Sequence, residues 1–133
     1  MIDVAITDDQ QIILNGLQKI IAEANDLHLM GVFTNGDDLL ESLQQKTPQV
    51  LLLDIYMPGK NGIELAGIIS KAYPSVNIIA LTNVDIIPQV KKMLQQGAVG
   101  YLLKDAAPEI IIDAIRKVAA GEKYLYADPS ARL

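Results

Sequence analysis

The stretch Val50-Leu51-Leu52-Leu53-Asp54 decides the fold, because an unbroken apolar run of strand length is closed by a single carboxylate. A strand with one solvated face alternates apolar and polar residues, whereas a strand buried on both faces is apolar throughout. Residues 50–53 therefore predict a central strand of a parallel sheet. Asp54 is then expected at the carboxyl end of that strand, where open parallel sheets bind their ligands.

On both sides of this run, strand patterns alternate with helix patterns along the chain. Short β-rich runs are separated by segments in which apolar residues recur at helical spacing. Such an alternation implies a parallel sheet with helices on both faces, joined by right-handed crossovers. We predict an α/β fold with a doubly wound five-stranded parallel sheet of order 2-1-3-4-5. The expected strands are 2–7, 27–33, 50–53, 76–81 and 99–103, and the expected helices are 11–24, one from the turn at 34–38 to residue 43, 63–73, 86–96 and 108–120.

The composition suits one soluble domain and excludes several kinds of site. The chain has 133 residues, half of them apolar, which is enough for one core. The absence of cysteine excludes disulfides and thiolate sites, and the single histidine, His28, excludes a multi-histidine metal site. A net charge of −5 disfavours binding of this domain to nucleic-acid phosphates. No apolar run reaches roughly 18 residues and no signal-peptide pattern is present, so we expect a cytoplasmic protein without membrane contact.

Three carboxylates are expected in one crevice of the predicted sheet. Asp8 and Asp9 follow the first strand and Asp54 ends the third, and these two strands are neighbours where the strand order reverses. Like charges about 4 Å apart repel by about 4 kcal/mol per pair at an effective dielectric constant near 20. A divalent cation such as Mg²⁺ would relieve this repulsion. The alternative is that Asp8 and Asp9 only cap the first helix.

Two further polar residues end the fourth and fifth expected strands. Lys104 directly follows the fifth strand, so its ammonium can point into the same crevice and pair with an anion held at Asp54. Thr82 follows the fourth strand, and its hydroxyl can bond a phosphoryl oxygen. The alternatives are a surface lysine with its charge in water and a threonine that caps a helix starting near Asp85.

Several short motifs together resemble the receiver domain of two-component response regulators, over residues 2 to about 120. The set carries the resemblance, since no single motif is specific, and it implies the flavodoxin/CheY-like (βα)5 fold. The last two motifs are most similar to the LuxR/NarL/FixJ-type subfamily, in which the receiver precedes a helix-turn-helix output domain. The motifs are Thr7-Asp8-Asp9-Gln10, Leu53-Asp54-Ile55-Tyr56-Met57-Pro58-Gly59, Asn61-Gly62, Leu81-Thr82, Gly100-Tyr101-Leu102-Leu103-Lys104-Asp105 and Gly121-Glu122-Lys123-Tyr124-Leu125.

The resemblance implies a nucleophile and a metal site. Asp54 would be the phosphoacceptor, a carboxylate that takes a phosphoryl group from a sensor histidine kinase. Mg²⁺ would be bound by Asp9, Asp54 and the backbone carbonyl of Tyr56, and Asp8 would bind it directly or through water.

The resemblance also implies a switch. Lys104 and Thr82 would hold phosphoryl oxygens, and Tyr101 would turn inward when Thr82 moves toward the phosphoryl group. Taken alone, Tyr101 is equally consistent with an ordinary strand tyrosine.

The same resemblance implies how the chain is organised and with what it interacts. Residues 1–121 would form the receiver, and 122–133 would be a tail or the start of a linker to a helix-turn-helix output domain, for which 133 residues leave no room. DNA binding would belong to that absent domain, and a homodimer through the first and fifth helices is consistent with the family. A receiver is not an enzyme beyond the phosphorylation and dephosphorylation of its own Asp54.

The residues leave two other functions open. A Mg²⁺-dependent phosphatase with an aspartate nucleophile usually carries a second aspartate two residues later, where this chain has Tyr56. The second alternative is a receiver-like interaction module that is never phosphorylated. A further hypothesis is that the bulky Tyr56 shields the acyl phosphate of Asp54 from water.

Overall fold

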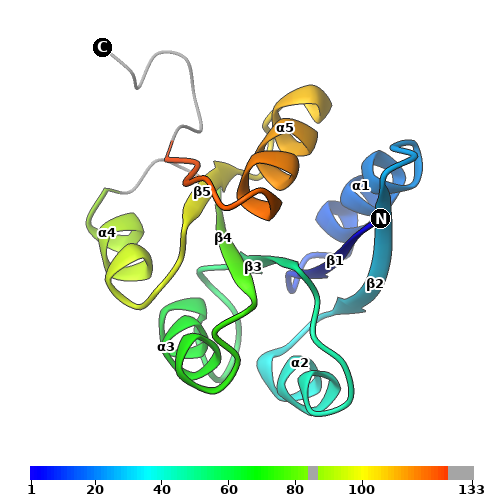
Figure 1. Cartoon of the computed structure of the whole chain (residues 1–133). Coiled ribbons are helices and arrows are strands. Elements are labelled where there is room, and N and C mark those ends of the chain that lie inside the picture. The colour runs from blue at the N-terminus through cyan, green and yellow to red at the C-terminus, as the bar shows by residue number, and fades with distance from the viewer. Residues whose placement is uncertain (84–86, 126–133) are drawn as a thin grey trace.

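The computed structural model describes residues 1–83 and 87–125 of the chain. Five strands form one parallel sheet in the order β2-β1-β3-β4-β5, which confirms the predicted doubly wound α/β topology (Figure 1). The strands are β1 (Ile2–Thr7), β2 (Leu27–Phe33), β3 (Val50–Asp54), β4 (Asn77–Thr82) and β5 (Gly100–Leu103), and the helices are α1 (Gln11–Ala22), α2 (Gly36–Leu43), α3 (Gly62–Ala72), α4 (Ile87–Gln95) and α5 (Pro108–Ala119).

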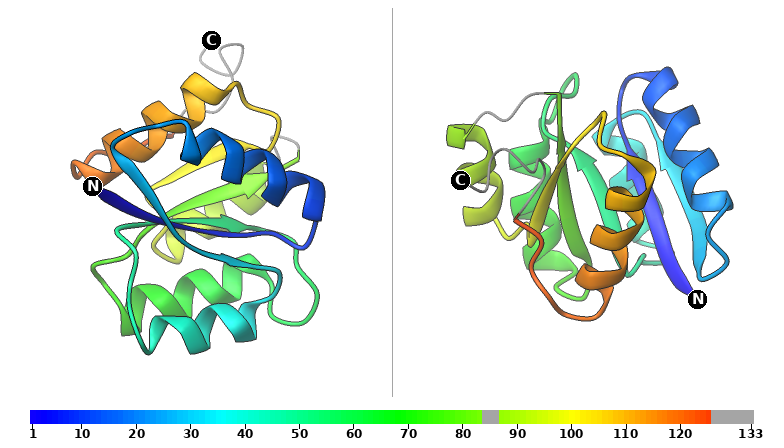
Figure 2. Two further views of the ribbon diagram at one scale, coloured as in Figure 1. Left: turned by 90° about the vertical axis from the view of Figure 1, so that its right-hand side faces the viewer. Right: turned by 90° about the horizontal axis from the view of Figure 1, so that it is seen from above.

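Helices cover both faces of the sheet, as Figure 2 shows from two further sides. α1 and α5 pack on one face, and α2, α3 and α4 pack on the other. Each face has its own apolar cluster, and consecutive residues of β3 contribute to them in turn. Leu52 belongs to the cluster under α1 and α5, whereas Leu53 belongs to the cluster under the other three helices. The sheet is therefore buried between two helical layers.

β3 is the central strand, and all of its residues are buried. It pairs with β1 on one side and β4 on the other, so that Leu53 lies opposite Thr7 and Ala80. Burial on both faces and both edges explains why this strand is apolar up to its last residue, Asp54.

The predicted element bounds agree with the structure to within two residues. The largest difference is at the end of α1, which stops at Ala22, where a turn closed by a hydrogen bond from Ala24 N to Ile21 O follows. Ile86, where the fourth helix is predicted to start, lies outside the described residues. Among the helices that the structure describes, none is long and apolar enough to cross a membrane.

The loop between β3 and α3 is folded tightly against the end of β3. Gly62 begins α3, and a Cβ atom at this position would collide with the backbone carbonyl of Asp54. The Gly62 N–H donates to Ile55 O at 2.9 Å, and the side chain of Asn61 caps the helix by accepting from Glu64 N. The loop backbone is thereby held beside the carboxyl end of the sheet.

Candidate functional site

The carboxyl ends of β1 and β3 bring three carboxylates together. Asp8 and Asp9 follow β1, and Asp54 is the last residue of the adjacent β3. One carboxylate oxygen from each of the three lies within 4.8 Å of the other two. Asp8 and Asp54 are 0% and 1% exposed, whereas Asp9 is exposed. The three carboxylates that were expected to meet at this edge of the sheet therefore form an acidic cluster.

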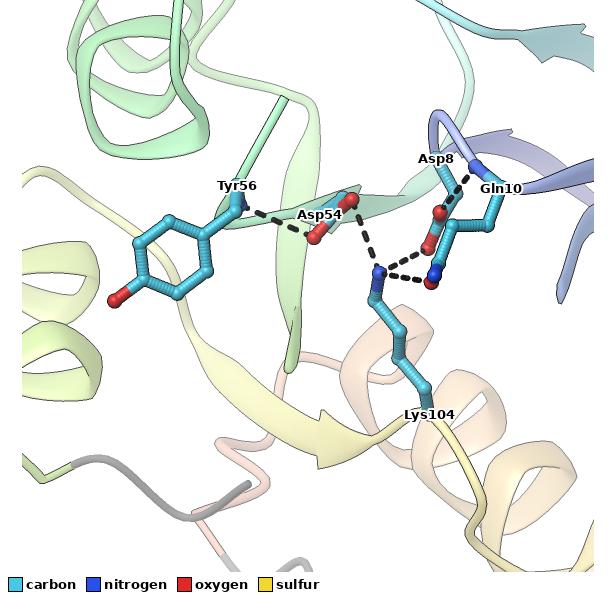
Figure 3. A network of polar contacts seen from close by, with 5 residues as sticks. All are labelled: Asp8, Gln10, Asp54, Tyr56 and Lys104. Carbon is cyan, nitrogen blue, oxygen red and sulfur yellow. Dashed lines mark hydrogen bonds and ion pairs between the residues drawn. The ribbon is translucent and has the colours of Figure 1, made fainter. Parts of the chain in front are cut away.

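The ammonium of Lys104, which follows β5, lies between the two buried carboxylates (Figure 3). Its Nζ is 2.8 Å from Asp8 Oδ2 and 3.0 Å from Asp54 Oδ2. The Lys104 side chain is only 5% exposed, so the alternative of a surface lysine with its charge in water is wrong. One ammonium thus faces two carboxylates, and the third carboxylate, Asp9, adds further negative charge.

Backbone hydrogen bonds fix the orientation of both buried carboxylates. Asp54 Oδ1 accepts from the Tyr56 N–H at 3.1 Å, and Asp8 Oδ1 accepts from the Gln10 N–H at 2.8 Å. Each carboxylate therefore directs one oxygen to a loop N–H and the other to Lys104. The alternative that Asp8 and Asp9 only cap the first helix is wrong, because the N-cap residue of α1 is Gln10 and no side chain caps this helix. Asp8 bonds the N–H of Gln10 before the helix begins and makes an ion pair across the sheet.

Gln10 is a member of the site that sequence reasoning missed. Its Oε1 accepts a hydrogen bond from Lys104 Nζ at 3.3 Å, so the ammonium that pairs with Asp8 and Asp54 also contacts a neutral amide oxygen. Gln10 is the N-cap residue of α1, yet its side chain makes no capping bond. A neutral amide gives no charge signal, and its place directly after Asp8 and Asp9 is the one clue that the sequence contains.

The ionisation of the site follows from burial and charge. Burial raises the pKa of Asp54 to about 6, and the negative charge of Asp8 adds to this rise while the hydrogen bond from Lys104 opposes it. Burial disfavours the charged form of Lys104, but its hydrogen bonds to Asp8 and Asp54 raise its pKa above the ordinary value. At neutral pH Lys104 is therefore charged and Asp54 is mostly ionised.

The donor set of the three aspartates fits Mg²⁺. Hard oxygen donors are what this ion prefers, and it often takes only one or two carboxylates together with water. A carboxylate has about four lone-pair positions, and the contacts with Tyr56 N and Lys104 use only two of those on Asp54. Asp8, Asp9 and Asp54 could therefore hold a divalent cation without breaking the bonds described above.

Thr82 lies at the same edge of the sheet as the acidic cluster. It is the last residue of β4, one position beyond Leu81, which pairs with Asp54 in the adjacent strand. Thr82 is 1% exposed, and its backbone carbonyl accepts from the Lys104 N–H at 2.8 Å. Residues 84–86, where the capping alternative for Thr82 placed a helix start, lie outside the described part of the chain.

Tyr101 lies inside the fold. It pairs with Ala80 of β4 and is 7% exposed, within the apolar cluster that includes Val90 and Met93 of α4. Its ring is therefore already inward in this structure.

Comparison with known proteins agrees with the fold. Residues 4–116 match the family described as "Response regulator receiver domain". The uncharacterized transcriptional regulatory protein YxjL of Bacillus subtilis (strain 168) is 39% identical over 132 residues, which cover 99% of this chain and 61% of YxjL. The response regulator UvrY of Escherichia coli (strain K12) is 34% identical over 128 residues, which cover 96% of this chain and 59% of UvrY.

A solved structure of a response regulator has the same fold. The isolated receiver domain of RcsB from Salmonella enterica serovar Typhimurium, determined in the presence of the phosphomimetic BeF3-, superposes with a TM-score of 0.87 at 28% identity. The superposition covers 98% of this chain and 96% of that domain. The chain spans about three fifths of the length of the curated relatives YxjL and UvrY. The sheet order, the acidic cluster and these matches show that the chain belongs to the family of response regulator receiver domains, in its LuxR/NarL-type branch.

Proposed function

We propose that the chain is a phosphorylation-dependent signalling switch, in which Asp54 accepts a phosphoryl group from a sensor histidine kinase. The observation that carries this proposal is the position of the Asp54 carboxylate, 3.0 Å from the Lys104 ammonium and grouped with two carboxylates that could share a cation. Phosphoryl transfer depends on positioning and charge neutralisation more than on covalent help. Membership of the receiver family supports the same function.

In the transfer step, a carboxylate oxygen of Asp54 attacks the phosphorus of a phosphohistidine. The O–P bond forms while the N–P bond of the histidine breaks, and the ring nitrogen leaves with the electron pair. The charge of Lys104 neutralises part of the charge on the phosphoryl oxygens. Hydrolysis by water later restores the Asp54 carboxylate and releases inorganic phosphate, so the chain acts only on itself.

Access to Asp54 requires a local rearrangement. Asp54 is 1% exposed, and the side chain of Lys104 lies directly on its Oδ2. The neighbouring Asp9, Gln10 and Tyr56 are all exposed, so the buried carboxylate lies close to the protein surface. Movement of the Lys104 side chain is proposed as part of this rearrangement, since its ammonium lies 3.0 Å from the oxygen that must be uncovered.

We propose Mg²⁺ as the cofactor, held by Asp8, Asp9, Asp54 and the backbone carbonyl of Tyr56. When bound, the ion supplies positive charge to the phosphoryl oxygens. The hydrogen bond from Tyr56 N to Asp54 Oδ1 keeps the loop backbone beside the carboxylate, which supports Tyr56 as a ligand.

Thr82 and Tyr101 are the proposed switch. An acyl phosphate adds negative charge and strong acceptor oxygens at Asp54, which the Thr82 hydroxyl and the Lys104 ammonium can bond. To move a two-state equilibrium from 1:99 to 99:1 requires about 5.5 kcal/mol. Several charge-assisted contacts can supply this energy, whereas one hydroxyl cannot. Movement of Thr82 would change the β4–β5 face, on which Tyr101 packs against α4.

The output is proposed to be transcription regulation. In this proposal, residues 1–121 are the receiver, 122–133 begin a linker, and DNA is contacted only by a domain outside this chain. A solved structure of RcsB contains two dimers bound to two parallel DNAs, which supports a homodimer. A cytoplasmic location is part of the same proposal.

The test is the mass of the protein after incubation with acetyl phosphate and Mg²⁺. We expect the gain of one phosphoryl group, which Asp54→Asn abolishes and Asp105→Asn, at an exposed aspartate, retains. Continuous phosphate release from many phosphate esters would instead show an aspartyl phosphatase. A chain that takes no phosphoryl group from acetyl phosphate or from histidine kinases would be an interaction module, and the proposal would be wrong.

A further inference from the structure

Gln10 begins α1, but its side chain does not cap this helix. Its backbone carbonyl accepts from the N–H groups of Ile13 and Leu14, and its extended backbone, with a φ of −98° and a ψ of 114°, is that of an N-cap residue. N-cap side chains are usually short and polar, because they bond the free N–H groups of the first helical turn. The longer side chain of Gln10 makes no such bond. The helix that it begins therefore does not account for a glutamine at this position.

The side chain of Gln10 instead reaches the residue that follows β5. Its Oε1 accepts from Lys104 Nζ at 3.3 Å, a contact between residues that are 94 positions apart in the chain (Figure 3). An ammonium group can only donate, so the amide oxygen and not the amide nitrogen must face it. The backbone N–H of Gln10 donates to Asp8 Oδ1 at 2.8 Å. Gln10 therefore contacts both members of the ion pair between Asp8 and Lys104.

The three oxygens around the Lys104 ammonium differ in charge, distance and burial. Asp8 Oδ2 and Asp54 Oδ2 lie 2.8 and 3.0 Å from Nζ and belong to carboxylates that are 0% and 1% exposed. Gln10 Oε1 carries no net charge, lies 3.3 Å from Nζ and belongs to an exposed residue. The ammonium is thus bound by two buried charged groups and by one exposed neutral group.

We propose that Gln10 is a positioning residue for phosphoryl transfer, which retains the Lys104 ammonium at the site when a phosphoryl group displaces it from Asp54 Oδ2. The inference rests on the proposed function. A phosphoryl group on Asp54 needs the space beside Oδ2, where the ammonium lies at 3.0 Å. Exposed side chains change rotamer readily, so Gln10 can follow the displaced ammonium and keep its bond. The charge of Lys104 then stays beside the phosphoryl oxygens.

The neutrality of the Gln10 side chain suits this role. Only an interaction that is stronger in the transition state than in the ground state accelerates a reaction. Another carboxylate beside Asp8, Asp9 and Asp54 would bind the ammonium firmly before the transfer and would repel the phosphoryl oxygens. An amide oxygen adds no negative charge, so the ammonium charge remains available to the phosphoryl group.

The first experiment measures, by mass, the rate at which the chain gains a phosphoryl group from acetyl phosphate in the presence of Mg²⁺. Gln10→Met keeps an unbranched side chain of similar length but removes the oxygen. We expect phosphorylation to become roughly fivefold slower, because a hydrogen bond to a charged group is lost. Gln11→Met is the matched control, since Gln11 is exposed and bonds only Asn15 within α1 among the described residues. Its rate should equal that of the wild type.

Gln10→Asn separates the positioning role from a structural role in α1. Asparagine is a favoured N-cap residue, so this variant should have a free energy of unfolding at least equal to that of the wild type. Its side chain is one methylene shorter, so its amide oxygen should not reach Lys104. We therefore expect a stable chain that is phosphorylated roughly fivefold more slowly, whereas a merely structural role predicts the wild-type rate.

The second experiment tests whether Gln10 acts through Lys104, by urea denaturation without metal or phosphodonor. Gln10→Met should lower the urea midpoint of the wild type but not that of the Lys104→Met chain, in which the ammonium is absent. Residues that do not interact would instead give additive effects. This measurement examines the contact in the resting chain, independently of phosphoryl transfer.

Phosphorylation at the wild-type rate or faster in folded Gln10→Met and Gln10→Asn would overturn the positioning role. An equal urea effect of Gln10→Met with and without Lys104 would overturn it as well. Both outcomes leave the proposed function intact, because the wild type still gains a phosphoryl group. A wild-type chain that takes no phosphoryl group from acetyl phosphate or from histidine kinases would overturn the proposed function, and the role of Gln10 with it.

Discussion

The ammonium nitrogen of Lys104 lies 3.0 Å from Oδ2 of Asp54. Asp54 ends β3 and Lys104 follows β5, so this contact spans β4, which lies between the two strands in the sheet. The same ammonium bonds Asp8, so one cation balances two buried carboxylates. Removing one partner of a buried ion pair leaves uncompensated charge, which is costlier than the pair itself is stabilising. The stability of the unphosphorylated chain therefore depends on the same residue that is proposed to hold the phosphoryl group.

Lys104→Met should destabilise the metal-free chain. We expect the free energy of unfolding at neutral pH to fall by about 3 kcal/mol, because Asp8 and Asp54 lose their counter-charge. Urea denaturation measures this change. Lys60→Met is the matched control, since Lys60 pairs with Asp37 at 3.1 Å on the surface, and an exposed pair contributes about 0.2–1 kcal/mol. Equal effects of the two substitutions would contradict the prediction.

The raised pKa of Asp54 predicts a pH-dependent stability with a definite sign. The folded chain keeps a proton on Asp54 up to about pH 6, whereas the unfolded chain loses it near 3.8. The folded state therefore binds more protons in this interval, and the free energy of unfolding falls as the pH rises through it. The shift from 3.8 to about 6 corresponds to about 3 kcal/mol.

The Asp54→Asn variant lacks the titrating carboxyl group. Comparing it with the wild type therefore isolates the contribution of Asp54 to the pH dependence of the free energy of unfolding. We expect the free energies of unfolding of the wild type and Asp54→Asn, measured by urea denaturation without metal, to differ least near pH 4. As the pH approaches 7, Asp54→Asn should become the more stable of the two. Parallel pH profiles for the two proteins would show that the Asp54 pKa is not raised.

Mg²⁺ should stabilise the wild-type chain through the three aspartates. A ligand at about 100 times its dissociation constant adds about 2.7 kcal/mol to the free energy of unfolding, which appears as a higher Tm in a thermal melt. Asp9→Asn removes one carboxylate of the cluster and should abolish most of this rise. Asp105→Asn, at an exposed position outside the cluster, should keep it. A Mg²⁺ effect that survives Asp9→Asn would place the ion elsewhere.

The sequence was sufficient to predict the fold because hydrophobicity alone distinguishes its central strand. Val50 to Leu53 are apolar on both faces, and each is buried. Strand ends are less predictable, because ladder hydrogen bonds determine them. Thr82 belongs to β4, with its carbonyl bonded to Lys104 N, although its polar side chain suggests that the strand stops before it.

The acidic site was predictable as a set of residues but not in its detail. The rule that strand ends meet at one edge of a parallel sheet brought Asp8, Asp54 and Lys104 together. It could not indicate that Lys104 would bond both carboxylates or that Gln10 would accept a hydrogen bond from it. These contacts depend on side-chain rotamers. The pairing of Tyr124 with β5 was missed because the segment around it is too short for a strand pattern.

The last prediction concerns the Tyr56 side chain and whether it shields the acyl phosphate of Asp54 from water. It is 51% exposed, and Figure 3 shows its ring directed away from Asp54 and Lys104, while its N–H donates to Asp54 Oδ1. Substitution therefore leaves the backbone contact in place and changes only the bulk at the edge of the site. If the ring shields the acyl phosphate by excluding water, Tyr56→Asn should hydrolyse it at least about threefold faster.

Tyr56→Phe keeps the ring without its hydroxyl and should hydrolyse at the wild-type rate, because bulk and not hydrogen bonding is what the shielding requires. The measurement is the decay of the phosphorylated mass after acetyl phosphate is removed, at fixed Mg²⁺. An unchanged decay rate in Tyr56→Asn would mean that the ring keeps the outward position of Figure 3 in the phosphorylated chain and that water reaches the phosphoryl group past it.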